Sequence, residues 1–230
     1  MTGEVEANLH ALRDAIDDEL RRCGRSPESL TLVGVAKRQP HARVVAAIEA
    51  GLRDVGESYL QEARAKFEDL PPVRKHFVGH IQTNKAAAIA ELFGLVQSVD
   101  REEAGTALAR AAQRLDKVLP VLIQLNISPV ERYGCPPEQA ERLADTLRAQ
   151  PSLRFDGVMA IGPHTGDRAT IAKAFELAAM TLGRVGGTTL SIGMSGDWPE
   201  AVRAGSTMVR IGEALFGSRR APQERREERG

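Results

Sequence analysis

The chain has 230 residues, of which 42% are hydrophobic and only 4% aromatic, so its core must be built from aliphatic side chains. Basic and acidic residues each number 31, and this zero net charge argues against a nucleic-acid-binding surface, which usually needs a basic excess. The two cysteines fit neither a disulfide framework nor a metal spacing, and no apolar run approaches the roughly 20 residues of a membrane helix, so we expect a soluble cytoplasmic protein that contacts neither membrane nor nucleic acid.

The first predicted element is an amphipathic helix. Val5, Leu9, Leu12, Ile16 and Leu20 follow one another at steps of three or four residues, which places them on one helical face. The segment is also acidic, which is not typical of a signal peptide.

Strands and helices then alternate in eight units. Strands are predicted at 30–37, 53–58, 75–81, 95–100, 118–127, 155–162, 189–194 and 207–212. Helices are predicted at 42–51, 59–70, 85–94, 101–115, 136–150, 168–185, 198–205 and 213–217. This count favours a single closed (β/α)₈ TIM barrel with an extra N-terminal helix over residues 1–218. An open doubly wound sheet is the alternative, but it usually has fewer strands and a glycine-rich first turn. Residues 219–230 are predicted to be a charged, disordered tail.

Lys37 stands out because it ends the apolar run "LTLVGVAK". Lysine is rarely buried without a partner. One interpretation is a side chain that extends from the strand end into solvent. The other is a nucleophilic amine that condenses with an aldehyde, because functional residues of such barrels follow the strands.

A second candidate site follows the last two predicted strands, in "SIGMSGDWPEAVRAGSTMVRIGEALFG". Barrels of this type often bind a phosphate in these loops, where Ser195 and the backbone at Gly212 would lie. Turn-forming residues alone would explain the same glycines and serines.

The two candidate sites are neighbours in a closed barrel, because the first strand pairs with the last. Their common ligand would carry an aldehyde and a phosphate, which describes pyridoxal 5′-phosphate; a sugar phosphate of a Schiff-base aldolase is the alternative. Arg210 would then face the pyridine nitrogen.

The motifs "VGVAKRQP", "GESYLQEARAK", "HFVGHIQTNK", "LNIS" and "SIGMSGD…GSTMVRIGEALFG" resemble the pyridoxal-phosphate homeostasis protein family, the single-domain relatives of the alanine racemase N-terminal barrel. The resemblance implies that Lys37 holds the cofactor as an internal aldimine and that Arg210 faces the pyridine nitrogen. It further implies a phosphate site made of Ser195, Ser206, Thr207 and Gly212. The family usually has asparagine where this chain has Ser58.

Two function classes remain after the resemblance. One is a carrier that binds pyridoxal phosphate and serves its intracellular supply without robust catalysis, with pyridoxal-phosphate-dependent apoenzymes as partners. The other is an amino-acid racemase or lyase of the alanine racemase type, which needs a second base. Neither Tyr59 nor Tyr133 is an evident second base, and the chain has no room for the domain that supplies one in alanine racemase. An arginine at the ring nitrogen also does not readily give up a proton. We therefore expect a monomeric carrier.

Overall fold

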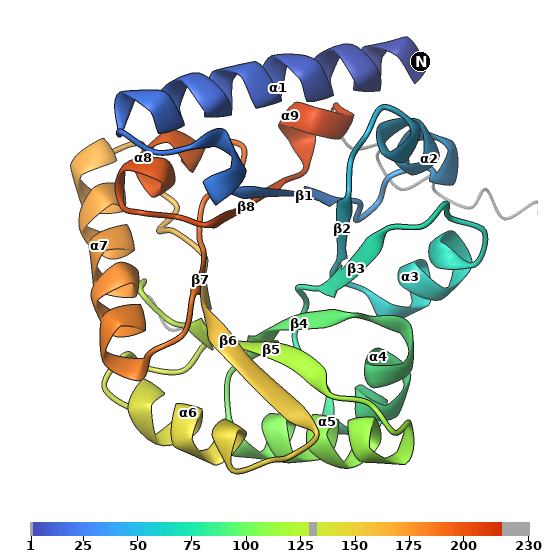
Figure 1. Ribbon diagram of the computed structural model, residues 1–230, viewed down its shortest axis with the longest axis vertical. Helices are drawn as coiled ribbons and strands as arrows, with labels where there is room; N and C mark the ends of the chain where they lie inside the picture. The colour runs from blue at the N-terminus through green and yellow to red at the C-terminus, as the bar shows by residue number, and fades with distance from the viewer. Residues whose placement is uncertain (1, 129–132, 218–230) are drawn as a thin grey trace, which may run out of the picture.

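Eight parallel strands close into one barrel in the computed structural model, which describes residues 2–128 and 133–217. The predicted TIM barrel is therefore confirmed, whereas the predicted tail at 219–230 lies outside the described residues. The strands follow the chain order around the barrel (Figure 1). They are β1 (Thr31–Val35), β2 (Asp54–Glu57), β3 (Arg74–Phe77), β4 (Leu95–Val99), β5 (Leu119–Leu125), β6 (Leu153–Ala160), β7 (Thr189–Ser191) and β8 (Met208–Ile211).

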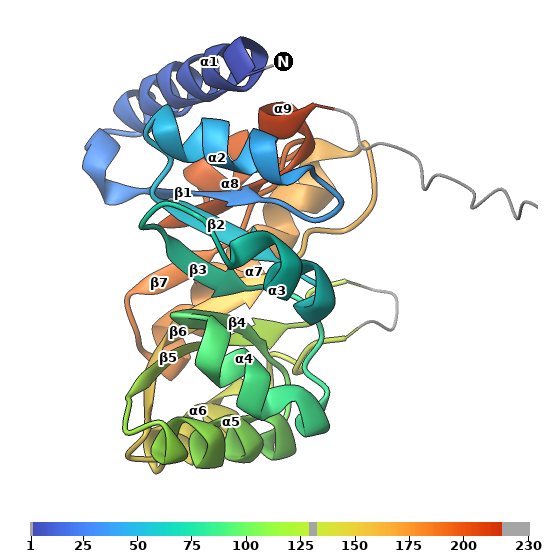
Figure 2. The same ribbon diagram turned by 90° about the vertical axis from the view of Figure 1, so that its right-hand side faces the viewer.

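Helices cover the outside of the barrel, and α2, α3, α4 and α5 follow one another down the side shown in Figure 2. The α-helices are α1 (Thr2–Arg22), α2 (His41–Glu49), α3 (Leu60–Phe67), α4 (Ala86–Leu92), α5 (Glu102–Arg114), α6 (Ala140–Arg148), α7 (Arg168–Val185), α8 (Trp198–Arg203) and α9 (Glu213–Phe216). Two short 3₁₀ helices, η1 (Pro27–Ser29) and η2 (Thr83–Lys85), complete the set. Within the described ranges, no helix has the length and apolarity that a bilayer crossing requires.

The extra N-terminal helix α1 packs across the outer helices α2, α8 and α9 (Figure 1). Val5, Leu9, Ile16 and Leu20 are at most 3% exposed, which confirms the predicted apolar face. The helix thus covers the region where the last units of the barrel meet the first.

Most predicted elements differ from the structure by one to four residues at their bounds, and helix α6 and strand β7 are two examples. Helix α6 begins at Ala140 rather than at 136, because the chain first returns to the barrel: Cys135 donates its N–H to Gln124 O at 2.7 Å and accepts from Asn126 N at 2.9 Å. Strand β7 ends at Ser191, three residues earlier than predicted.

Closure of the barrel is made by the pairing of β1 with β8. Val33 is in register with Arg210, and Gly34 with Ile211. Because parallel strands end at the same rim, this register brings the residues that follow β1 close to the end of β8. The loop after β7 belongs to the same rim.

Candidate functional site

A pocket of about 260 Å³ lies at the C-terminal ends of the strands. It unites the first candidate site, Lys37, with the second, represented by Ser195, Arg210 and Gly212. The other lining residues are Val35, Ser58, Val78, Met159, Ile161, Met194, Gly196 and Glu213. The walls are therefore mostly apolar, with a lysine and an arginine among them.

Lys37 follows β1 by two residues and is half-buried. The ammonium group of Lys66 fixes the backbone just before it, donating to Ala36 O at 2.6 Å. Directly after Lys37 the chain turns at Arg38, which has a φ of 59°, and the Arg38 N–H donates to Glu62 Oε2 at 2.7 Å. Contacts from α3 thus fix the backbone on both sides of Lys37.

The same lysine of α3 also connects to the end of β2. Lys66 Nζ lies 2.8 Å from Glu57 Oε2 and 3.3 Å from Glu62 Oε2, so its three donors have three acceptors. The other oxygen of Glu57 accepts the N–H groups of Ser58, at 2.7 Å, and of Tyr59, at 3.2 Å. The ends of β1 and β2 are consequently bound into one corner of the pocket.

Gly79 explains how the chain after β3 packs against this corner. A Cβ on Gly79 would lie only 2.0 Å from Ser58 O, so no other residue allows this close approach. The neighbouring Val78 thereby reaches the pocket wall.

Arg210 is on β8 and only 4% exposed. Its Nη1 donates to Ser191 O at 2.6 Å and to Ser191 Oγ at 2.7 Å, and its Nη2 donates to Ala160 O at 2.8 Å. Burial lowers the pKa of Arg210 to about 10, an effect opposed by the negative charge of Asp197, and the group remains a cation at neutral pH. Of the five N–H donors of arginine, three are used by described residues, which leaves the Nε–H and one Nη2–H for the pocket.

A turn after β7 presents Ser195 and Gly196 to the pocket. Asp197 holds this turn, since its side chain accepts from Met194 N and its own N–H donates to Met194 O at 3.1 Å. Ser195 Oγ accepts the N–H of Ala214 at 3.3 Å, which ties the turn to the start of α9. Serine hydroxyls and glycine backbone N–H groups together suit a phosphate.

Two predicted phosphate ligands, Ser206 and Thr207, are not brought to this pocket. They precede β8, so they lie at the opposite rim from the residues that follow it. Ser206 Oγ donates to backbone carbonyls, at 2.9 Å to Ile192 O, and Thr207 Oγ1 accepts the N–H of Leu190 at 2.9 Å. Their hydroxyls therefore serve the joint between β7 and β8.

Eight of the twelve lining residues lie outside the predicted cofactor-binding set, and three of these, Ser58, Gly196 and Glu213, are polar residues or glycine. Ser58 ends a predicted strand, which already placed it at the rim, and the family usually has asparagine at this position. Gly196 and Glu213 flank predicted residues, and their neighbours Ser195 and Gly212 were the available signal. Two other rim residues, His80 and Gln82, line an adjacent pocket of about 210 Å³ that shares Ser58. In the described part of the chain, no cluster of His, Cys, Asp and Glu is suited to a metal ion.

Comparisons with known proteins agree with this geometry. The family model "Alanine racemase, N-terminal domain" matches residues 8–220. The pyridoxal phosphate homeostasis proteins of Pseudomonas aeruginosa and Escherichia coli K12 are 40% and 37% identical to this chain; 94% of this chain is covered, with 96% and 97% of theirs.

Solved structures with the same barrel fold are also similar to this chain. PipY of Synechococcus elongatus PCC7942, with PLP bound, has a TM-score of 0.80 and 31% identity over 93% of this chain and 100% of that one. An alanine racemase of Clostridium difficile shares the fold at a TM-score of 0.72 and 14% identity, over 96% of this chain and 58% of that one. The chain thus belongs to the alanine racemase N-terminal domain family and, within it, to the pyridoxal phosphate homeostasis proteins.

Proposed function

We propose that this protein binds pyridoxal 5′-phosphate through a Schiff base on Lys37 and takes part in the homeostasis of that cofactor. The observation that carries the proposal is that Lys37 and the buried Arg210 line one pocket together with the Ser195–Gly196 turn and Gly212. A PLP-bound structure of PipY and the names of the curated relatives support the same cofactor.

The pocket suits the three chemical parts of the cofactor. The Lys37 amine condenses with the aldehyde carbon, and the oxygen leaves as one water molecule. The two remaining N–H donors of Arg210 match an unprotonated pyridine nitrogen, which only accepts hydrogen bonds. Ser195, Gly196 and Gly212, which all line the pocket, receive the phosphate.

The apolar residues fit the flat ring between these polar groups. Met159 lies on β6, Ile161 directly follows β6, and Met194 follows β7, so the ring would be packed by side chains of the pocket wall. When bound, pyridoxal phosphate supplies an electrophilic carbon and an electron-withdrawing ring. An arginine that keeps its proton leaves the ring a poor electron acceptor, which favours holding the cofactor over turning over a substrate.

The placement of the tyrosines further favours a carrier over a racemase or lyase. Tyr59 is 49% exposed and lines the adjacent pocket, and Tyr133 is 65% exposed and stacks on His80 at 4.0 Å. Neither lines the Lys37 pocket, so neither is placed as a second base opposite the lysine.

Titration of purified protein with pyridoxal phosphate tests the proposal. We expect a visible absorption band that borohydride fixes on the peptide containing Lys37. Lys37→Ala should abolish both the band and the label, whereas Lys173→Ala, at an exposed lysine on α7, should retain them. A protein that stays colourless and unlabelled contradicts the proposal. In that case the alternative of a Schiff-base aldolase without cofactor is favoured.

The homeostasis role needs its own test. We place this role in the cytoplasm, with a monomer that supplies pyridoxal-phosphate-dependent apoenzymes. Loaded protein should reactivate a purified apotransaminase faster than Lys37→Ala mixed with the same amount of free cofactor. Steady racemisation or elimination of L-amino acids by the wild type, absent in Lys37→Ala, would instead favour the enzyme.

A further inference from the structure

A hydrogen-bonded chain of buried side chains crosses the inside of the barrel. Its members, here named the axial chain, are Arg210 on β8, Ser191 on β7, Gln97 on β4, His76 on β3 and Asp54 on β2. All five are at most 4% exposed. The interior of a TIM barrel is usually filled by branched aliphatic side chains, so a continuous polar chain there calls for a function.

The bonds of the axial chain all point in one direction. Arg210 Nη1 donates to Ser191 Oγ at 2.7 Å, and this hydroxyl donates to Gln97 Oε1 at 2.7 Å. Gln97 Nε2 lies 2.9 Å from His76 Nδ1, and His76 Nε2 lies 2.9 Å from Asp54 Oδ1. Because the amide oxygen already accepts from Ser191, Nδ1 must accept from the amide and the ring proton is on Nε2. The chain therefore runs from donor to acceptor between a cation and an anion.

A second contact fixes the orientation of the Gln97 amide. Its Nε2 also lies 3.2 Å from Met208 Sδ. A turned amide would direct its oxygen at the thioether sulfur, which has no proton to donate, and would lose this contact. In the observed orientation, no buried side-chain nitrogen or oxygen of residues 2–128 and 133–217 lacks a partner.

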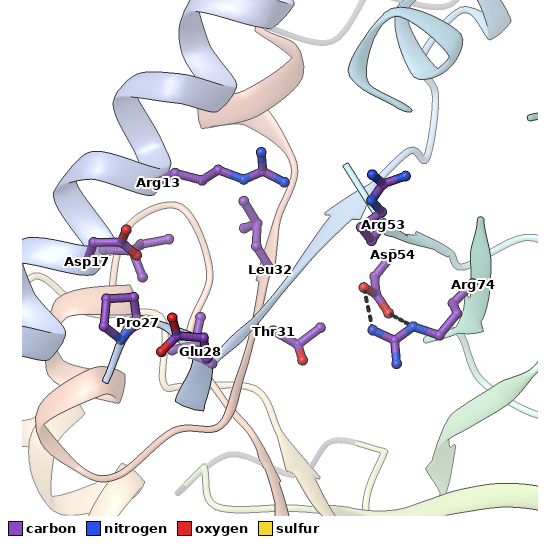
Figure 3. Close-up of a pocket in the computed structure, with 11 residues that line it drawn as sticks. Arg13, Asp17, Pro27, Glu28, Thr31, Leu32, Arg53, Asp54 and Arg74 are labelled. Atoms are coloured by element: carbon purple, nitrogen blue, oxygen red, sulfur yellow. Dashed lines mark hydrogen bonds and ion pairs between the residues drawn. The ribbon is translucent and has the colours of Figure 1, made fainter. Parts of the chain in front are cut away.

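The far end of the axial chain reaches the opposite rim of the barrel. Asp54 is the first residue of β2, and its carboxylate binds Arg74 through two contacts, Nε–Oδ1 at 2.8 Å and Nη2–Oδ2 at 3.0 Å (Figure 3). This ion pair borders a second pocket, of about 370 Å³, whose lining includes Arg13 and Thr31 (Figure 3). Buried polar groups thus connect the outer pocket with the Lys37 pocket.

We propose that Ser191, Gln97 and His76 are positioning residues for Arg210, anchored at the opposite rim by the Asp54–Arg74 ion pair. The inference rests on the proposed function, because a guanidinium of fixed orientation matters for a ring nitrogen placed before it. Arg210 makes its only side-chain hydrogen bond among the described residues to the Ser191 hydroxyl, its other partners being backbone carbonyls. Loss of that hydroxyl therefore removes one of the three hydrogen bonds that hold the guanidinium, and it breaks the link between Arg210 and the rest of the axial chain.

Ser191→Ala tests the proposal, with Ser98→Ala as its matched control. Ser98, on β4, is 1% exposed and donates to Gly79 O at 2.6 Å, so each variant deletes one buried, bonded hydroxyl. We expect Ser191→Ala to raise the Kd for pyridoxal phosphate about tenfold and to shift the visible band, because a bond to a charged group is lost. Ser98→Ala should change neither the Kd nor the band. Ser191→Thr, which keeps the hydroxyl, should have the Kd and the band of the wild type.

Two further variants extend the test along the axial chain. Gln97→Met keeps the side-chain length but removes the amide, and it should match Ser191→Ala in direction. Asp54→Asn, at the opposite rim, should raise the Kd about two- to threefold although it touches no cofactor-binding residue. In the cofactor-free protein, the ¹⁵N resonance of Arg210 Nε should shift in Ser191→Ala and stay in place in Ser98→Ala.

The outcomes separate the two proposals. A wild type that forms no visible band on Lys37 overturns the proposed function and this inference together. A wild type that binds normally, with Ser191→Ala and Gln97→Met equal to Ser98→Ala in Kd, band and Arg210 resonance, overturns the inference alone. If Ser191→Ala does not fold, Gln97→Met decides the question.

Discussion

Lys66 and Arg210, both buried in the part of the chain that the structure describes, are cations that are stabilised in different ways. Lys66, in the corner between β1 and β2, has a side chain only 8% exposed and contacts two carboxylates, of which Glu57 is fully buried. Arg210, in the pocket, is 4% exposed and is bonded to a hydroxyl and two carbonyls. No carboxylate lies within ion-pair distance of Arg210 among the described residues; Asp197 acts on it over a longer range.

This difference separates a structural cation from one reserved for a ligand. The charge of Lys66 is neutralised at once by Glu57, so it holds the backbone but offers nothing to the pocket. The neutral partners of Arg210 fix its position without cancelling its charge, which is left to act on whatever enters the pocket. The two cations should therefore respond differently to the same substitution.

The largest effect is expected for Lys66→Met. Removal of the ammonium leaves the fully buried Glu57 carboxylate without its ion-pair partner, which should lower the free energy of unfolding by about 3–5 kcal/mol. Urea unfolding measures this loss. Lys173→Met, at an exposed lysine, should stay within about 0.5 kcal/mol of wild type. Adding Glu57→Gln to Lys66→Met should recover part of the loss, and a Lys66→Met protein as stable as wild type would refute the assigned role.

A smaller loss of stability is expected for Arg210→Met. The variant leaves Ser191 and the Ala160 carbonyl without their donor but leaves no buried carboxylate unpaired, so the free energy of unfolding should fall by about 1–3 kcal/mol. The affinity for pyridoxal phosphate should fall at least tenfold, measured by absorbance titration. Arg110→Met, at an exposed arginine on α5, should change neither quantity. The comparison fails if Arg210→Met loses more stability than Lys66→Met.

The sequence was sufficient for the fold and for the core of the site because both depend on local order along the chain. The alternation of strands and helices predicted the barrel, and functional residues of such barrels follow the strands. These two observations were enough to predict that Lys37, Ser195 and Gly212 lie together, as they do in the pocket. Helix α7 was predicted with both of its bounds, since its periodicity continues to the Gly186–Gly187 pair.

The motif "GSTMVRIGEALFG" also suggested Ser206 and Thr207 as phosphate ligands, but the structure places both at the opposite rim of the barrel. They lie close in sequence to Arg210 but precede β8, and a strand carries its two ends to opposite rims. Neither could the axial chain be predicted, because Gln97 and Ser191 are 94 positions apart and meet only when β4 and β7 face each other across the closed barrel. The position of a side chain inside a barrel depends on the register of every strand, which no local pattern states.

A moderate gain in affinity is expected for Glu213→Gln. Glu213 is exposed at the rim of the pocket, next to Gly212, where its negative charge opposes a phosphate. The substitution should strengthen pyridoxal phosphate binding about two- to fivefold at low salt, and high salt should reduce the gain because exposed charges are screened. Glu176→Gln, at an exposed position on α7, is the control for net charge and should have no effect. Equal affinities of Glu213→Gln and wild type at low salt would place the phosphate elsewhere.

The smallest effect is expected for Asp197→Asn, and it should appear as a dependence on pH. Burial raises the pKa of Asp197; Glu200 adds to the effect, while the Met194 N–H, Arg210 and Arg168 oppose it. A folded-state pKa above the unfolded value means that the folded protein binds the proton more tightly. The stability from this group is thus fully present below the unfolded pKa and is lost as the pH rises through the folded pKa. Asparagine keeps the oxygen that accepts the Met194 N–H but does not titrate. As the pH rises from the acid range to neutrality, the free energy of unfolding of wild type should therefore fall relative to that of Asp197→Asn. Urea unfolding of both proteins across that pH range measures the difference. The other carboxylates titrate in both proteins, so their contributions to the free energy of unfolding cancel in it. A constant difference would show that the pKa of Asp197 is the same in the folded and the unfolded protein, which would contradict the expected effect of burial on this carboxyl.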